Sequence, residues 1–489
     1  MSTHVTESMI RAADRALAQH PEFGDSSAIS TLVTERYKFG LDLFAPALPG
    51  VARALPILET WEESTTNALF ADPLIQFSIE RAFESLANGE PATSPHELER
   101  WLGVATASFA RGGRLGLVQD QMNRPWPVAK GKTYLWDLPA ANPVTSELER
   151  NFREHFMTGR DVQVEFVAPD ERTAGAVDRA CSLFGELLPE TADSVFRHVS
   201  AMALAVMRAG GGRLLTGSAG DGVPGTVILS SEEIDNPWDT AAHLLHEGLH
   251  EKFADITRFA SLIRDNVPVG FPWRADEEGF TLARALSAFH VYVHFVLYES
   301  AVRCYGARLT GRYGSLDAHP VSAHAMSVVR TGSGPYARGA ERCRYLGKQL
   351  STTWAAHLTS AGQRFVHWLL ECIEPIGVTE SPPVRLTGEA PPIVRVSRAV
   401  GYRKNPHLKE RPLENEGLLF AFAPEMPRVQ LLTLNSWIIS ELCDGSTMEA
   451  IGERYFDIVG ARLTPAEAQQ QLALGLQQLE RGRVIEKVP

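Results

Sequence analysis

The sequence predicts an α+β protein with a long, mostly helical first domain and a smaller second domain of short strands and helices. Three observations support this fold class. Apolar residues recur at three- and four-residue spacing through 1–110, and helical patterns return between about 238 and 373. Residues 162–167 alternate in the manner of a strand, and 226–230 form another short strand after a glycine-rich loop. A proline-rich segment then precedes a region in which short strands and helices follow one another.

The proline-rich segment sets the predicted domain boundaries. Its four prolines stand in two pairs, a composition that suits an exposed linker at 381–395. We therefore predict a first domain at 1–380, of which 1–160 is mainly helical, and a second domain at 396–489. A chain of 489 residues is long enough to bury a sizeable core in this arrangement.

Charge and cysteine content exclude several classes of protein. The chain has 47 Lys and Arg against 59 Asp and Glu, a formal charge of -12, which argues against general nucleic-acid binding. The N-terminus lacks the apolar core of a signal peptide, and no apolar run reaches the length of a membrane span. Five scattered cysteines without a CxxC pair fit a reducing compartment. We expect a cytoplasmic protein without nucleic-acid or membrane partners.

The strongest chemical signal is a His-Glu-x-x-His motif on the helix predicted to begin near Trp238. His246 and His250 are four residues apart, so both imidazoles share one helix face and can reach one metal ion. Glu247 stands beside them as the candidate catalytic residue. His243 lies one turn earlier, where it either supports a ligand or binds the metal itself.

A third protein ligand must come from elsewhere in the chain. Phe253 and Ile256 occupy the positions where metzincins have glycine and histidine, so that continuation is absent. A following apolar helix carries His290 and His294, again four residues apart, and we favour His290. The alternatives that stay open are His294 and the glutamates Glu277, Glu278 and Glu299.

Two arginines near these histidines are candidates for binding a co-substrate. Arg274 lies between the motif and the histidine-bearing helix, and Arg284 lies less than two turns before His290. An arginine can hold a carboxylate through two parallel hydrogen bonds, although either residue alone is also compatible with an ordinary surface position. Three neutral imidazoles leave a divalent metal with its full charge, and imidazoles with open positions beside them suit iron(II) oxygen chemistry.

The motif, the Pro-Trp-Arg segment at 272–274 and the histidine-bearing helix together resemble the HExxH-type peptide-modification proteins of ribosomal peptide biosynthesis. That family is understood as iron(II)- and 2-oxoglutarate-dependent peptide β-hydroxylases that use dioxygen. The resemblance covers about 200–300 and implies zincin-like local geometry around the motif. The residues that it implies are the iron ligands His246, His250 and His290 and, for 2-oxoglutarate, Arg274 and Arg284.

The last part of the chain resembles a second family. NPHLKERPLENEGLLFAF, VQLLTLNSWIISELCDGSTMEAIGERY and the helix from Thr464 to Arg481 resemble the PqqD-like domain, or RiPP recognition element. A generic DNA-binding winged helix fits this region less well, because the helices predicted here lack a basic face. The resemblance implies a winged-helix-like fold that holds the leader of a precursor peptide by strand addition. The implied strand residues are Arg428, Val429, Gln430, Leu431, Leu432, Thr433 and Leu434.

The two resemblances together imply an Fe(II)/2-oxoglutarate-dependent dioxygenase that hydroxylates a residue in the core of a precursor peptide. The second domain would hold the leader and raise the effective concentration of the core at the metal. Glu247 would then orient a ligand or substrate. In one alternative, a zinc metallopeptidase, Glu247 would be the general base for bound water. In the other, a non-catalytic peptide-binding scaffold, His243 or His294 would complete a closed structural metal site.

Overall fold

The structure is a computed structural model with a mostly helical α+β architecture, in agreement with the predicted fold class. Contacts divide the chain into two units. Unit 1 comprises Met1–Thr34, Thr60–Phe77 and Gly103–Val384, and unit 2 comprises Glu35–Glu59, Ser78–Leu102 and Arg385–Pro489. The residues that the structure describes are 5–88, 93–111, 126–139, 143–157, 162–209, 213–214, 217–218, 223–274, 280–314, 336, 339–376, 401–413, 417–424, 426–461 and 463–488.

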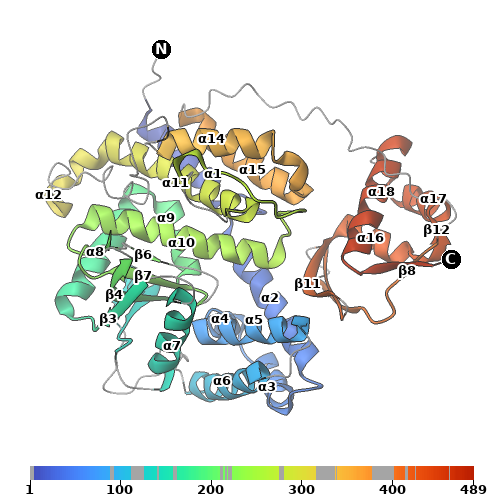
Figure 1. The fold of residues 1–489 in the computed structure, drawn as a ribbon, viewed down its shortest axis with the longest axis horizontal. Helices are drawn as coiled ribbons and strands as arrows, with labels where there is room; N and C mark the ends of the chain where they lie inside the picture. Colours follow the sequence, from blue (N-terminus) through green and yellow to red (C-terminus); the bar gives the residue numbers. More distant parts are fainter. Residues whose placement is uncertain are drawn as a thin grey trace. The chain divides into compact units, whose positions relative to one another are not determined.

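The helices span most of the described chain (Figure 1). From the N-terminus as far as Ile373 the helices are α1 (Glu7–Ala18), α2 (Ser26–Phe44), α3 (Pro49–Glu59), α4 (Glu63–Phe70), α5 (Pro73–Asn88), α6 (Thr93–Phe109), α7 (Pro143–Met157), α8 (Glu171–Leu187), α9 (Pro189–His198), α10 (Pro237–Phe259), α11 (Leu282–Tyr305), α12 (Thr310–Tyr313), α14 (Gly339–Ser351) and α15 (Ser360–Ile373). Of these, α3 belongs wholly to unit 2, and α2, α5 and α6 are divided between the two units. The remaining helices of unit 2 are α16 (Leu434–Leu442), α17 (Met448–Val459) and α18 (Pro465–Arg481).

A mixed sheet of seven strands forms the β part of unit 1. Its strands are β1 (Trp126–Val128), β2 (Thr133–Trp136), β3 (Val162–Val167), β4 (Ala201–Ala209), β5 (Arg213–Leu214), β6 (Gly217–Ser218) and β7 (Thr226–Ser230). The order is β1-β2-β4-β7-β6, with β3 and β5 also paired to β4. β4 runs parallel to β2 and β7. The bounds predicted for 162–167 and 226–230 are confirmed by β3 and β7.

Helix α10 lies between strand β7 and helix α11 (Figure 1). It begins after Asn236, whose side-chain oxygen accepts from the backbone N–H of Trp238 at 3.1 Å, and Pro237 is its first residue. Gly248 permits close packing against α9, because a Cβ there would lie 2.3 Å from Cγ1 of Val195. The helix is thus held on several sides, and only part of one face is open to solvent.

Unit 2 contains two three-stranded sheets. The first has the order β11-β10-β9, with β9 (Lys409–Leu413), β10 (Leu418–Ala423) and β11 (Met426–Thr433) antiparallel. The second has the order β12-β8-β13, with β8 (Gly401–Lys404), β12 (Asp444–Thr447) and β13 (Ile485–Val488). Leu419 and Leu432 of the first sheet pack in one core with residues of α16, α17 and α18.

Two helix boundaries in unit 2 test the predictions made for it. Helix α18 begins after Thr464, which forms a capping box with Glu467, and Gly482 caps its end as predicted. Leu434 was predicted in the strand, but this was wrong: β11 ends at Thr433, and Leu434 is the first residue of α16. The physical reason is that the Thr433 side chain accepts from the N–H of Ser436 and so caps the helix at that point. The predicted linker at 381–395 lies outside the described residues.

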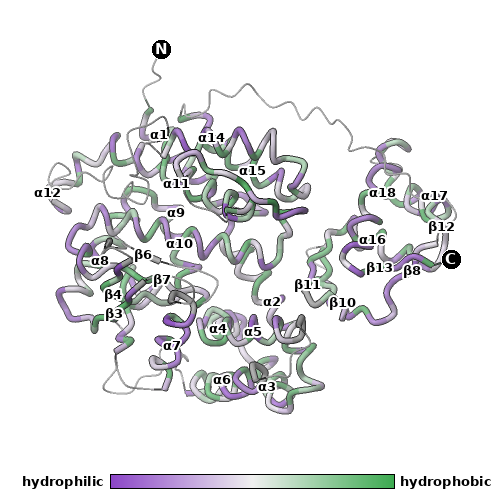
Figure 2. The backbone as a smooth tube through the Cα atoms, in the orientation of Figure 1, coloured by the Kyte–Doolittle hydropathy of each residue, from purple (hydrophilic) through white to green (hydrophobic). Residues whose placement is uncertain are grey.

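Hydrophobic and hydrophilic residues alternate along the helices in Figure 2, as expected of helices with one buried face. Among the helices of the described chain, none is both long enough and apolar enough to cross a bilayer. All five cysteines are free, and Cys304 on α11 is exposed whereas Cys181, Cys343, Cys372 and Cys443 are buried.

Candidate metal centre

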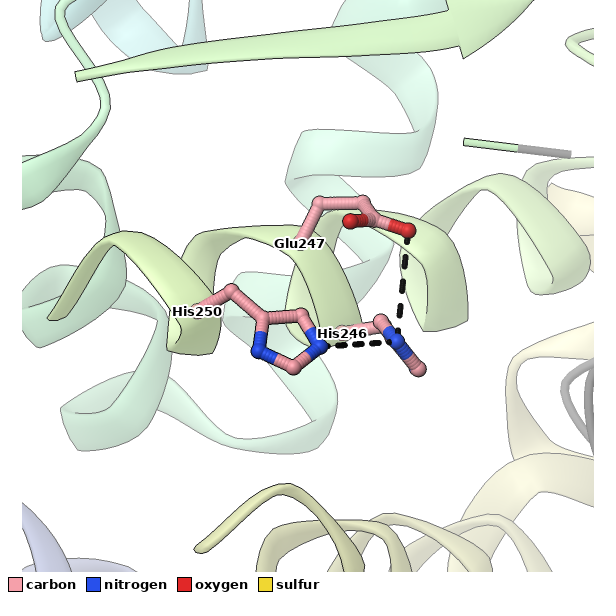
Figure 3. A group of neighbouring side chains, drawn as sticks. All are labelled: His246, Glu247 and His250. Carbon is pink, nitrogen blue, oxygen red and sulfur yellow. Dashed lines mark hydrogen bonds and ion pairs between the residues drawn. The ribbon is translucent and has the colours of Figure 1, made fainter. Parts of the chain in front are cut away.

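Two imidazole rings meet on one face of α10. Nε2 of His246 and Nε2 of His250 lie 3.1 Å apart. Figure 3 shows both rings on the same side of the helix, with dashed lines that join His246 to His250 and to Glu247. Two nitrogens that bind one ion at about 2.1 Å and at a right angle would be about 3.0 Å apart. The spacing therefore fits two neighbouring ligands of a single metal ion.

Glu247 completes the group of ligand atoms. One ligand atom from each of His246, Glu247 and His250 lies within 4.8 Å of the others, and no other such group of three occurs in the part of the chain described here. Oε1 of Glu247 is 4.0 Å from Nε2 of His246, and the glutamate is buried. A carboxylate in this position can orient a ligand, bind the ion or accept a proton from bound water.

Ser287 of α11 fixes the ring of His250. Its Oγ lies 2.9 Å from Nδ1 of His250, so the other ring nitrogen is left to face His246. Burial, followed by the positive charge of Arg284, lowers the pKa of His250 to about 4. The ring is therefore neutral at pH 7, which is the form that binds a metal ion.

The structure places one of the two predicted arginines near this pair. Arg284 is exposed, its guanidinium carbon lies 4.6 Å from the ring centroid of Phe280, and its charge acts on His250. Arg274 ends the short 3₁₀ helix η4 (Pro272–Arg274), and its side chain lies outside the described part. An anion bound beside His250 would thus meet the charge of Arg284.

His290 does not join the group formed by His246, Glu247 and His250. It is fully buried on α11, with its ring centroid 6.1 Å from that of Phe253 and 5.6 Å from that of Phe365. Neither ring nitrogen makes a hydrogen bond of normal geometry, although a looser hydrogen-bond interaction with the backbone of Leu249 raises the pKa of the ring. Burial lowers the pKa of His290 more strongly, and His294 lowers it further. A buried imidazole with only such a poor hydrogen bond is costly, and metal coordination would offset that cost.

The other ligand candidates have different neighbours. Nδ1 of His294 donates to the backbone oxygen of His290 at 2.8 Å. Nε2 of His243 lies 3.7 Å from Oε2 of Glu233. Glu299 pairs with Arg303 at 2.9 Å. The structure brings none of His243, His294 and Glu299 into the group on α10. The candidates Glu277 and Glu278 lie outside the described residues.

In unit 2, β11 occupies an edge position of its sheet as far as the described strands extend. Val429 and Leu432 point into the protein and are buried, Gln430 and Leu431 are half-buried, and Thr433 is exposed. The side chain of Arg428 lies outside the described part. Nε2 of Gln430 donates to the backbone oxygen of Gly482 at 2.5 Å, which ties the strand to the end of α18. An edge strand offers backbone groups to which a further strand can pair.

Ser287, the partner of His250, was not among the predicted site residues. A serine three residues before His290 in an apolar helix is a weak signal, because serines often bond to their own helix. Only the antiparallel packing of α11 on α10 brings it to the metal face.

No protein-family model matches this chain. No curated protein matches it either.

Proposed function

We propose that this protein is an Fe(II)/2-oxoglutarate-dependent dioxygenase that hydroxylates the β-carbon of a residue in a ribosomally made precursor peptide. The observation that carries the proposal is the pair of Nε2 atoms 3.1 Å apart on α10, with the charge of Arg284 acting beside it. We also propose a cytoplasmic location, because a reducing compartment keeps the five cysteines free. The proposed folds are a zincin-like arrangement around α10 and a winged-helix-like PqqD-type domain in unit 2.

The residues that would hold iron are His246, His250 and, as third ligand, His290. The first two have the spacing of neighbouring ligands, and His290 is a buried imidazole without a hydrogen bond of normal geometry. Iron with 2-oxoglutarate and dioxygen supplies the oxidising power: one oxygen atom enters the peptide C–H bond, and 2-oxoglutarate becomes succinate and carbon dioxide. Ser287 keeps His250 in the ring orientation that ligation requires.

Glu247 and Arg284 have different tasks in this scheme. Arg284 attracts a carboxylate of 2-oxoglutarate to the side of His250 and compensates its charge. Arg274 is the second candidate for the same task. Glu247 lies 4.0 Å from Nε2 of His246, where its carboxylate orients the ligand or the peptide and accepts no proton from water.

The precursor peptide would be held by its leader on β11. The strand lies at a sheet edge, and α18 is tied to it through Gln430. Residues 428–433 would donate and accept backbone hydrogen bonds along an added leader strand. The core of the peptide would then be presented to the metal at a raised effective concentration.

Mass spectrometry of the precursor peptide tests this function. We expect that incubation with Fe(II), 2-oxoglutarate and air adds the mass of one or more oxygen atoms, with succinate formed in parallel. The addition should stop when 2-oxoglutarate is left out. Cleavage of the peptide with zinc alone, without any oxygen added, would refute the proposal.

The second candidate is a zinc metallopeptidase that trims the precursor. One observation favours it: Glu247 belongs to the ligand group of His246 and His250, where a general base for bound water would stand. The same incubation separates the two functions, since a peptidase gives two fragments whose summed mass exceeds that of the substrate by one water.

A further inference from the structure

A chain of buried polar side chains lies behind α10 and joins it to α2 and α9. Nδ1 of His198 lies 2.6 Å from Oδ2 of Asp255, and Nε2 lies 2.9 Å from Oγ of Ser26. Oγ of Ser26 lies 2.6 Å from Oγ of Ser194. Nζ of Lys252 lies 2.8 Å from the same Ser194 oxygen. We call Ser26, Ser194, His198, Lys252 and Asp255 the anchor network.

One set of hydrogen-bond directions satisfies the whole anchor network. The carboxylate of Asp255 accepts from Nδ1–H of His198, and burial lowers the pKa of His198, so the neutral ring accepts from Ser26 at Nε2. Ser26 then accepts from Ser194, which accepts from Lys252. The chain therefore runs from Lys252 to Asp255, which both belong to α10, and it passes through α9 and α2 on the way. Lys252 also donates to the backbone oxygen of Gly24 at 2.7 Å.

The order Ser26–His198–Asp255 is that of a hydrolytic triad, but burial excludes this role. Ser26 is 4% exposed and His198 is 3% exposed, so no substrate reaches the hydroxyl. That hydroxyl is also engaged by both His198 and Ser194. A nucleophile requires access to the bond that it attacks. The arrangement therefore calls for an explanation other than catalysis.

The anchor network and the metal ligands occupy opposite faces of α10. Lys252 follows His250 by two residues, and Asp255 follows His246 by nine, which at 100° per residue places each about half a turn from its ligand. Gly248 lies on the anchor side, where Val195 of α9 approaches so closely that a Cβ would meet it at 2.3 Å. Apolar contacts alone tolerate sliding and rotation of a helix, whereas a directed chain anchored at both ends does not.

We infer that the anchor network positions the metal ligands by fixing the rotation of α10 about its axis. His198 is the central positioning residue, because it alone connects Asp255 to the α2 end of the chain. The five side chains lie outside the ligand group on α10, and they act through the backbone that carries His246 and His250. This inference rests on the proposed metal centre.

Titration of the chelator-treated full-length protein with Zn²⁺ alone tests the inference. We expect His198→Asn to raise the Kd for Zn²⁺ by about tenfold or more, the scale seen when groups that orient ligands are removed. Ser26→Ala should raise it by a smaller factor, because the bond between His198 and Asp255 remains. Ser27→Ala is the matched control on α2, since Ser27 is the exposed neighbour of Ser26.

Tyr305→Phe controls for a general loss of stability. This variant removes the buried hydrogen bond from Tyr305, at the end of α11, to the backbone of Leu187, at the end of α8, and should lower Tm without changing the Kd. If His198→Asn does not fold, the Kd of Ser26→Ala for Zn²⁺ tests the inference in its place. An unchanged Kd in the folded variants, or an equal change of the Kd in Tyr305→Phe, would overturn this inference but not the proposed metal centre. Failure of the wild-type protein to bind Zn²⁺ would overturn the proposed metal centre and this inference with it.

Discussion

At the level of single residues, both imidazoles on α10 have neighbours on α11. His250 bonds to Ser287, and the ring centroid of His246 lies 5.5 Å from that of Phe295. A hydrogen bond to the far nitrogen fixes both the tautomer and the orientation of a ligand ring. Ser287 therefore prepares the geometry of His250 before any metal binds.

We predict that Ser287→Ala weakens metal binding by about tenfold, because His250 loses the partner that fixes its orientation. Ser300→Ala is the matched control, since Ser300 lies on the same helix and bonds to the backbone of Val296. Calorimetric titration of both variants with Fe(II) without oxygen measures the effect. Equal affinities would show that Ser287 contributes nothing to the site.

Glu247→Gln separates the two candidate reactions. The change keeps the size of the side chain but removes the base, which in a hydrolase contributes about 10²–10⁴-fold in rate. An oxygenase activates no water, so we expect the variant to keep measurable 2-oxoglutarate turnover even if peptide hydroxylation falls. Succinate and oxidised peptide are measured together at equal metal occupancy. Loss of both products would give Glu247 a role that the proposed reaction does not contain.

His290→Leu tests the third ligand. We expect loss of metal comparable to that in His246→Ala and His250→Ala, whereas His294→Leu should have a milder effect because His294 bonds to the backbone of its own helix. Metal content after desalting measures the outcome. Full retention in His290→Leu would place the third ligand elsewhere, and the opposite order of the two variants would move it by one turn of α11.

The sequence pointed to His246 and His250 because their spacing is a local property of one helix. The environment of His290 depends on α15, which supplies Phe365 more than 70 residues later, so spacing alone could not place its ring. The bond between His198 and Asp255 likewise joins distant helices. Local periodicity identifies which face of a helix carries chemistry, but partners of buried polar groups follow from tertiary packing.

At the level of helices and strands, elements with a local sequence pattern were predicted, and elements without one were not. Strands β3 and β7 and helix α18 follow from alternation and capping residues within each segment. The short strands β1 and β2 were not predicted, because three or four residues carry too little pattern. No local sequence pattern indicates that residues 35–59 and 78–102 belong to the same unit as the C-terminal part of the chain.

The end of β11 provides a test of leader binding. Leu434 is 52% exposed where the strand passes into α16, and Ile458 on α17 is 54% exposed, so the two form a matched pair. We expect Leu434→Glu to weaken binding of the precursor peptide by about tenfold, because one lost apolar contact is worth 1–2 kcal/mol. Ile458→Glu should leave it unchanged. Fluorescence anisotropy with a labelled leader measures both, and equal effects would argue against this strand end as a contact.

At the level of the whole molecule, buried neutral histidines make stability depend on pH. Burial lowers the pKa of each: to about 4 for His250, to about 3 for His294, and to below its usual value for His198 and His290. In the unfolded chain the same groups titrate near 6.5. The unfolded state therefore binds more protons between about 6.5 and 4, and stability falls as pH falls through that window.

We predict that the metal-free protein loses up to about 1.4 kcal/mol per pH unit for each such histidine below pH 6.5. Asp255, whose pKa is held down by Arg258 and His198 against the effect of burial, would lose its contribution only at lower pH. Denaturant unfolding with a chelator at pH 7.5, 6.5 and 5.5 — values chosen to bracket about 6.5 — measures the slope. A flat profile would mean that these rings are protonated in the folded state.

The cysteine distribution makes the protein ready for site-specific labelling without mutation. Cys304 is exposed near the end of α11, whereas burial raises the pKa of Cys181, Cys343, Cys372 and Cys443 and keeps their thiols unreactive. A maleimide fluorophore or nitroxide would therefore attach to one defined position on the helix that carries Ser287 and His290. Its signal would report, in real time, whether α11 moves when metal, co-substrate or peptide is added.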